Sequence, residues 1–202
     1  MSNNDDEKFQ VFFGNQSVGE IDKSDDRLSD YRAGIELIKK QGLGRDVPKV
    51  DVIYHQARSF AAVSQRLHDA NSGTMPWRPL DIAPFVVNSC FAVEVYLKAI
   101  GELFCGKFQK GHDLAKLFSN MPIKVKALIS DTFDVCQEEK KITKKITALA
   151  CLRAHRKAFV EWRYMYEKSY APEIQIARIV ALLIACDRVF RAEYEIQKKD
   201  TK

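Results

Sequence analysis

Residues 82–104, IAPFVVNSCFAVEVYLKAIGELF, decide the fold, because they are apolar on almost every side of a helix. A helix of this kind is normally the buried centre of a bundle of helices. Asp81, directly before it, is a suitable N-cap. The chain has 202 residues but only 9 Gly and 6 Pro, which disfavours a turn-rich β fold. We therefore predict an all-α protein built around this central helix.

Apolar residues at helical spacing continue on both sides of the central helix. Upstream, Phe9, Val11 and Phe13 alternate before Val18 and Ile21, which indicates either a small hairpin or an unfolded arm. Pro48 follows a glycine-containing linker and marks the start of the main domain. We predict an N-terminal arm and short helix over 1–47, a helical bundle over 48–198 and a tail over 199–202.

Individual helices are delimited by cap residues, glycines and prolines. The first helix starts at Ser24 and presents a stripe of Leu28, Tyr31, Ile35 and Ile38. The remaining predicted helices cover about 52–67, 114–118, 122–133, 146–168 and 172–197, with a charged turn at 140–145.

Several classes of protein are disfavoured by the composition. The 5 cysteines are scattered among apolar residues, and no CxxC or HExxH motif occurs, so we expect reduced core thiols, no metal and no cofactor. No uninterrupted apolar run approaches the roughly 20 residues of a membrane span. The start of the chain also lacks the pattern of a signal peptide. We expect a cytoplasmic protein without a membrane, whose net charge of +5 permits an anionic partner.

Three polar residues interrupt the apolar central helix, namely Asn88, Glu94 and Lys98. Glu94 and Lys98 are four residues apart and can pair along the helix. A buried pair usually needs further hydrogen-bond donors, which His112 or Arg163 could supply.

The segments NSCFAVEVYLKAI (88–100), GHDLAKLF (111–118) and AFVEWRYMYE (158–167), in this order, resemble the HEPN family. The resemblance covers roughly residues 50–192. It implies an antiparallel bundle of about five helices that commonly forms a homodimer, in a family where many members are RNases and others are non-catalytic. The RNase members share an Arg followed four to six residues later by a His. None of the 4 histidines here has that spacing, and no His follows Arg163.

The function that we predict is therefore a HEPN-like dimeric module that binds a nucleotide or nucleic acid without the usual RNase motif. One alternative is a divergent metal-independent endoribonuclease of the toxin or defence type, in which His112 or His155 acts as acid or base. Another is a non-catalytic protein-interaction bundle, in which Glu94, Lys98 and Arg163 form a buried structural network. Whether the chain is an enzyme is left open at this point.

Each candidate catalytic or binding residue also has a purely structural interpretation. His112 and Asp113 could be an acid and its orienting carboxylate, or Asp113 could simply cap a helix. His155 lies on a stripe with Leu152, Phe159 and Trp162 and is more simply a packed histidine. The ligand-binding candidates are Asn88, Glu94, Lys98, His112, Asp113, Arg163, Tyr164 and Glu167.

Arg163 and Tyr164 suit a phosphate and a base, whereas Arg163 and Glu167 could equally form an i,i+4 pair. Basic residues of the middle of the chain could form a phosphate-binding patch or an ordinary solvated face. This basic patch comprises Lys144, Lys145, Arg153, Arg156 and Lys157.

Overall fold

The computed structural model describes residues 7–13, 16–43, 47–74, 76–107, 110–156, 158–164 and 174–200, except the side chains of Val160, Arg163 and Asp200. The chain divides into two compact units, Met1–Pro48 and Lys49–Lys202. The first unit has 7 Lys and Arg against 10 Asp and Glu, and the second has 25 against 17. The second unit therefore carries a net charge of +8, and the first carries −3.

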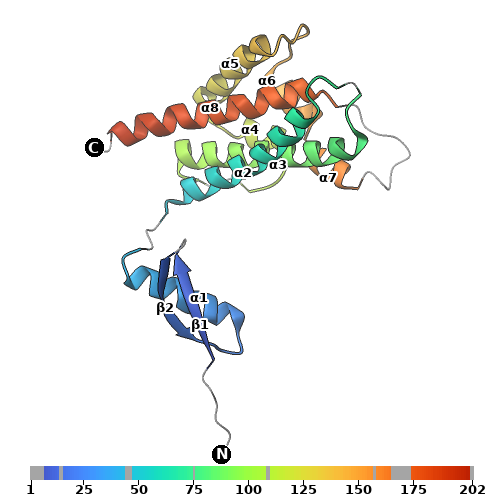
Figure 1. Ribbon diagram of the computed structural model, residues 1–202. Coiled ribbons are helices and arrows are strands. Elements are labelled where there is room, and N and C mark those ends of the chain that lie inside the picture. Colours follow the sequence, from blue (N-terminus) through green and yellow to red (C-terminus); the bar gives the residue numbers. More distant parts are fainter. Residues whose placement is uncertain are drawn as a thin grey trace, which may run out of the picture. The chain divides into compact units, whose positions relative to one another are not determined.

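The first unit is a hairpin packed on one helix (Figure 1). Strand β1 (Lys8–Phe13) pairs antiparallel with β2 (Gln16–Asp22), with an irregularity between Val11 and Phe12. The alternating apolar residues of the sequence lie in these strands. Helix α1 (Arg27–Lys40) follows.

Helix α1 starts and packs differently from the sequence prediction. Asp26, not Ser24, is its N-cap and accepts a hydrogen bond from the Leu28 amide. The predicted stripe is also wrong in part, because Leu28 and Tyr31 are exposed. The helix meets the hairpin through Gly34, which lets the Val11 side chain approach to 3.8 Å from the position of an added Cβ.

The second unit consists of helices, so the prediction of a mostly all-α fold is confirmed. The predicted bundle of about five helices is not confirmed, because the described part of this unit has four long helices of 17–27 residues and three short ones of 6 or 7 residues. Their bounds are α2 Lys49–Ala70, α3 Pro79–Cys105, α4 Leu114–Ser119, α5 Ile123–Glu139, α6 Ala148–Ala154, α7 Ala158–Arg163 and α8 Ile176–Asp200.

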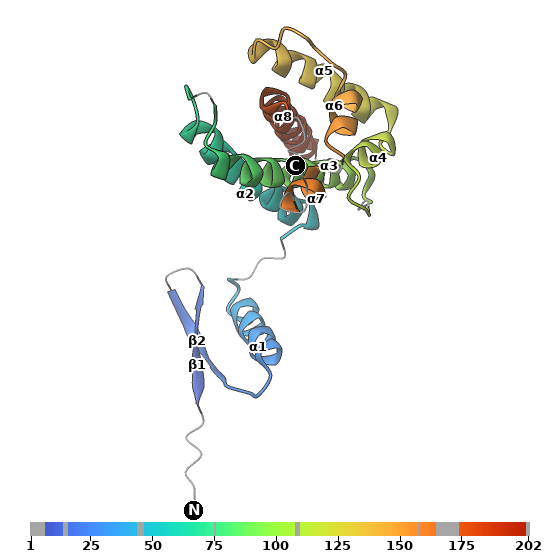
Figure 2. The ribbon, with the colours of Figure 1, turned by 90° about the vertical axis from the view of Figure 1, so that its right-hand side faces the viewer.

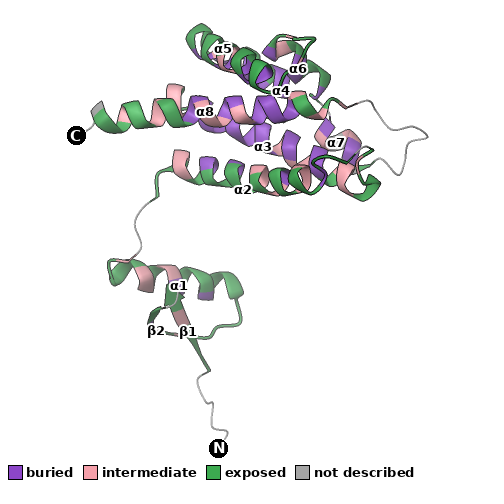
Figure 3. Cartoon of the chain, turned by 45° about the horizontal axis from the view of Figure 1, so that its top comes forward, coloured by how far each residue is buried: buried purple, intermediate pink, exposed green. Residues whose placement is uncertain are grey.

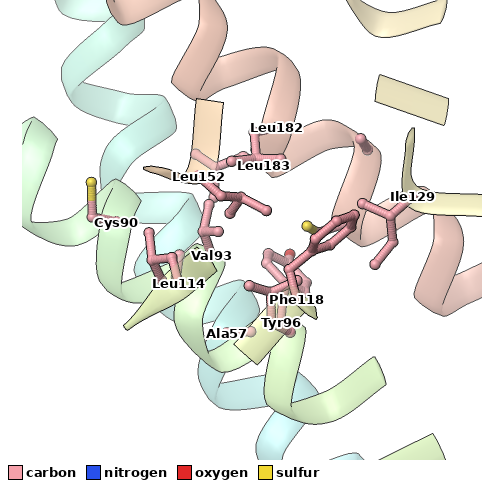
Figure 4. Packing of buried hydrophobic residues seen from close by; sticks show 14 of the residues in the cluster. Ala57, Cys90, Val93, Tyr96, Leu114, Phe118, Ile129, Leu152, Leu182 and Leu183 are labelled. Carbon is pink, nitrogen blue, oxygen red and sulfur yellow. The ribbon is translucent and has the colours of Figure 1, made fainter. Parts of the chain in front are cut away.

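Helix α3 is the centre of this unit and packs against α2, α4, α7 and α8. Figure 2 views α8 almost end-on, with α5 and α6 on one side of it and α2 and α3 on the other. Buried residues gather on α3 and on the facing side of α8 (Figure 3). In the core, Val93 and Tyr96 of α3 lie among side chains of α2, α4, α6 and α8 (Figure 4). Helix α3 is therefore apolar on almost every side because it is buried on several sides.

The start of α3 differs slightly from the prediction. The helix begins at Pro79, because proline suits the first helical turn. Asp81 lies inside that turn instead of capping it. Its carboxylate pairs with Arg78 at 2.7 Å and accepts a hydrogen bond from the side-chain amide of Asn71 at 2.8 Å. Asp81 therefore stabilises the loop before α3.

The single long helix predicted over 146–168 is wrong. Its described part is two short helices, α6 and α7, and His155 is the C-cap of the first. The His155 Nδ1 atom bonds the Cys151 carbonyl at 2.8 Å, at the turn where α6 ends. The apolar stripe concealed this break, because Leu152 and Trp162 are buried in the same core on either side of it.

Helix α3 is also long and apolar enough to cross a membrane, by length and composition only. Its 27 residues contain a window with a mean hydropathy of 1.5, so the expectation that no apolar stretch approaches the length of a membrane span is corrected for α3. However, 56% of that window is buried inside the structure. The core helix of a globular domain has the same composition.

Candidate functional site

A charged cluster lies inside the bundle at the middle of α3. We call Glu94, Lys98 and His112 the Glu94 cluster. Glu94 is only 1% exposed, and its Oε1 accepts from Lys98 Nζ at 2.7 Å and faces His112 Nδ1 at 2.9 Å. An ionised carboxylate only accepts hydrogen bonds, so His112 donates this one. The structure thus brings together the predicted Glu94–Lys98 pair and His112, which is one of the two further donors that the sequence suggested.

The loop before α4 delivers His112 to this cluster. Asp113 is the N-cap of α4, and its side chain accepts from the Lys116 amide at 3.0 Å. Asp113 therefore caps the helix, and the carboxylate that orients His112 is Glu94. The His112 side chain is 74% exposed although its partner is buried. The imidazole thus connects the inside of the bundle to its surface.

Two of the other ligand-binding candidates, Asn88 and Tyr164, lie within the described part of the structure. Asn88 donates to the Pro84 carbonyl of its own helix at 2.7 Å. Tyr164 follows the end of α7 and is exposed. The Arg163 side chain and all of Glu167 lie outside the described part of the structure.

His155 is buried, as expected for a packed histidine. Its Nδ1 bonds the Cys151 carbonyl and also faces the Cys151 sulfur at 3.8 Å. Burial lowers the pKa of His155 below its ordinary value. His155 is therefore a packed histidine with one bonded nitrogen, whereas His112 is the exposed histidine of the Glu94 cluster.

The basic patch is partly neutralised. Lys145 pairs with Glu138, which offsets the charge of that lysine. The backbone carbonyl of Lys144 accepts a hydrogen bond from Arg178 at 2.7 Å. Arg153 and Arg156 are exposed near the end of α6, and Lys157 lies outside the described residues. The turn that carries the two lysines is anchored by buried Gln137, which bonds the backbone of Ile146 through both ends of its amide.

A second polar cluster, which was not predicted from the sequence, is centred on Asp187 of α8. We call Asp187, Tyr54, Tyr96 and Arg191 the Asp187 cluster. Asp187 Oδ1 accepts from the hydroxyls of Tyr54 at 3.0 Å and Tyr96 at 3.1 Å, and Oδ2 pairs with Arg191 Nε at 2.8 Å. Burial, followed by the Asp187 charge, raises the pKa of Tyr54 to about 12 and also raises that of Tyr96. Both hydroxyls are therefore fixed donors.

A signal for this cluster does exist in the sequence. Asp187 interrupts the apolar run ALLIACDRVF (181–190), and a buried tyrosine needs an acceptor for its hydroxyl. The pairing itself could not be predicted, because Tyr54 and Asp187 are 133 residues apart.

The cysteines and the acidic residues offer no metal site among the described residues, since no group of three or more potential ligands comes together there. Cys90, Cys136, Cys151 and Cys186 are buried, whereas Cys105 is exposed. Burial raises the pKa of Cys90 and Cys151 to about 12, so both are protonated thiols at neutral pH.

No protein-family model matches the chain, and searches of curated proteins and of solved structures found no match either. A function for this chain is therefore inferred from the geometry of its own site and from the three segments 88–100, 111–118 and 158–167.

Proposed function

We propose that this protein is a HEPN-like helical module that binds a nucleotide or nucleic acid at the Glu94 cluster. The observation that carries the proposal is the exposed His112 held by the buried Glu94. In a purely structural network, an exposed imidazole would add little to the burial of the ion pair.

The chemistry of the cluster suits contact with a polar ligand. Lys98 already balances the charge of Glu94, so His112 need not be protonated to keep the cluster neutral. Because its Nδ1 donates to Glu94, the Nε2 atom of the neutral ring is left to accept a hydrogen bond from a sugar hydroxyl or a base amino group. The ring is held in one orientation, which lowers the entropy lost when a ligand binds.

The surrounding charge favours an anionic ligand. Lys107, Lys110 and Lys116 are close to His112 in the chain and exposed. The unit as a whole carries +8. Positive charge of this kind attracts phosphates over a long range and makes binding depend on salt. The sequence adds Arg163 and Tyr164 as a candidate phosphate contact and a candidate stacking residue.

Fluorescence anisotropy with labelled single-stranded RNA and with labelled ATP, each in EDTA at two salt concentrations, tests this proposal. His112→Ala should weaken binding about tenfold, the effect of one lost hydrogen bond. His55→Ala is the matched control, because His55 is an exposed histidine on α2. Equal affinity in the two variants would refute the site, and no salt-dependent binding at all would favour the interaction-bundle alternative.

Arg163→Ala belongs in the same series as a test of the sequence-based assignment. We expect it to weaken binding without unfolding the protein. Unfolding would instead assign Arg163 to a structural network and remove it from the ligand site.

The alternative of a divergent metal-independent endoribonuclease is favoured by one specific observation. A histidine oriented by a buried carboxylate, with its other nitrogen facing outward, is the arrangement of a general base. RNA cleavage in EDTA that is abolished in His112→Ala but not in His155→Gln would establish this activity. Cleavage that persists in His112→Ala would exclude His112 as the base.

A homodimer is part of the same proposal, on the resemblance to the HEPN family alone. Light scattering after size exclusion measures the mass directly against the 23.1 kDa of one chain. A mass of one chain at micromolar concentrations would remove dimerisation from the proposal while leaving the ligand site standing.

A further inference from the structure

A groove of about 360 Å³ opens between α2 and α8, with α3 as its floor. It lies away from the Glu94 cluster. Tyr96 lines the groove and follows Glu94 by two residues, which places their side chains about 200° apart around α3. The volume falls within the range of sites for small molecules, at about 300–1,000 Å³. This groove is therefore a separate place to look for a ligand.

One rim of the groove is cationic. Arg58 of α2 and Arg188 and Arg191 of α8 line it, against a single lining carboxylate, Asp187. Arg188 is paired at 2.8 Å with Glu139, which is on α5 and does not line the groove. The residues that a ligand would meet are thus net positive. Arginine is the side chain best suited to grip a phosphate or a carboxylate, because its donors are arranged in a fork.

The Asp187 cluster fixes one of these arginines in place. Arg191 uses Nε for its bond to Asp187, and its side chain is 62% exposed. Its terminal nitrogens can therefore face a ligand. Asp187 accepts hydrogen bonds from both tyrosines as well, so its charge is largely satisfied within the protein. A carboxylate held in this way repels an incoming anion less than an unpaired one would.

Ser64, Gln65 and His68 of α2 also line the groove, but a large part of its remaining wall is apolar. Ala61 and Ala62 of α2 face Val180, Leu183 and Ile184 of α8 across it. Small side chains on one helix leave room, and aliphatic side chains on the other give a ring or chain a surface on which to pack. A ligand that fills the groove thus needs two parts, an anionic head and an apolar body.

We propose that the groove between α2 and α8 binds a small organic anion, with a phosphate or carboxylate at Arg58 and Arg191 and an apolar body against Ala62 and Leu183. This site goes beyond the proposed function, since it uses neither His112 nor the lysines around it. A nucleoside monophosphate and a simple aryl phosphate share this chemistry, and the experiment distinguishes them.

Isothermal titration with phenyl phosphate, inorganic phosphate and adenosine monophosphate tests the site in the full-length protein. We expect phenyl phosphate to bind at least tenfold more tightly than inorganic phosphate, because only the first has an apolar body. Adenosine monophosphate that binds more tightly again would identify a nucleotide as the ligand, whereas weaker binding would identify a smaller aryl or alkyl anion. The absence of saturable binding by phenyl phosphate with a Kd below about 1 mM would overturn the proposal.

Two variants locate the site. Arg58→Gln should weaken phenyl phosphate binding about tenfold, the loss of one charge-assisted contact. Arg66→Gln is the matched control, because it removes the same charge from an exposed position on α2 that does not line the groove. Equal weakening in the two variants would mean diffuse attraction to the basic unit and would overturn the assignment.

Ala62→Trp tests the apolar half of the groove without changing any charge. Ala62 is exposed, so the larger side chain occupies the groove without entering the core. We expect phenyl phosphate to lose its advantage over inorganic phosphate in this variant. An unchanged advantage would overturn the proposed site. RNA binding should be unaffected by Ala62→Trp, so failure of this site and failure of the proposed function can be told apart.

Discussion

Replacement of Lys98 by Met gives the most direct test of the Glu94 cluster. Methionine keeps most of the volume of the lysine chain but removes its charge, and Glu94 keeps His112 as a partner. Breaking a buried ion pair from one side costs about 3–5 kcal/mol, because it leaves a buried charge without its counter-ion. His112 keeps its hydrogen bond to Glu94 in the variant, so the loss should lie at the lower end of this range. We therefore expect Lys98→Met to lower the free energy of unfolding by about 3 kcal/mol.

Urea unfolding measures this loss, with the fluorescence of Trp77 and Trp162 as the probe. Both tryptophans pack against the core of the second unit, so the signal reports that unit. A loss of this size should lower Tm by roughly 5–10 °C in a domain of about 150 residues. Lys49→Met is the matched control, because Lys49 pairs at 3.3 Å with Glu102 of the same helix α3 but is 59% exposed. It should cost much less.

The double variant Glu94→Gln/Lys98→Met makes the reasoning refutable. If the loss in the single variant comes from an uncompensated buried charge, removal of both charges should restore stability to within about 1 kcal/mol of the natural protein. A double variant as unstable as Lys98→Met would show that packing, not charge, is responsible. A Lys98→Met protein no less stable than Lys49→Met would show that Glu94 is not buried as an ion in solution.

Three further predictions concern stability and reactivity. Burial lowers the pKa of His155 below its ordinary 6.5, so the unfolded chain binds the proton more readily than the folded protein does. The free energy of unfolding should therefore fall as the pH drops through 6.5. His155→Gln should reduce this fall, which urea titrations at pH 7.5 and 5.5 measure. Ellman's reagent should label Cys105 quickly and the four buried thiols only after unfolding, and fast labelling of two or more thiols would contradict the observed packing. Asp113→Ala should cost about 1 kcal/mol and Asp113→Ser much less, since serine also caps helices; RNA binding that differs between these two variants would instead give Asp113 a role in the site.

The parts of the structure that the sequence predicted are those set by local chemistry. Residues 82–104 are apolar on almost every side of the helix, so they require burial, and the central position of α3 provides it. Glu94 in such a helix requires donors, and the nearest suitable cation along the helix is Lys98, one turn away. A further donor was expected because a buried carboxylate has more acceptor capacity than one lysine satisfies, and His112 was one of two candidates for it, with Arg163. Each of these inferences starts from one residue that needs burial or a hydrogen-bond partner, and from a group nearby in the sequence that can supply it.

The parts that could not be predicted depend on how distant helices meet. The break at His155 keeps the apolar stripe intact, so hydrophobic periodicity alone cannot detect it. The face of α1 was misplaced because Gly34, which has no side chain to bury, makes the close approach to the hairpin. The groove was missed because its residues come from α2, α3 and α8, whose relative rotation no local pattern sets.

The two polar clusters follow the same physical principle with different partners. In each, a carboxylate inside the second unit holds a side chain that reaches the surface, His112 on Glu94 and Arg191 on Asp187. The inner carboxylates also accept bonds from groups that stay inside the bundle, so their replacement alters stability and ligand contact together. The outer residues are 74% and 62% exposed, so their replacement should change ligand contact at a smaller cost to folding than replacement of the inner carboxylates. Comparison of inner with outer variants, cluster by cluster, therefore separates the structural role of each carboxylate from the binding role that we propose for its partner.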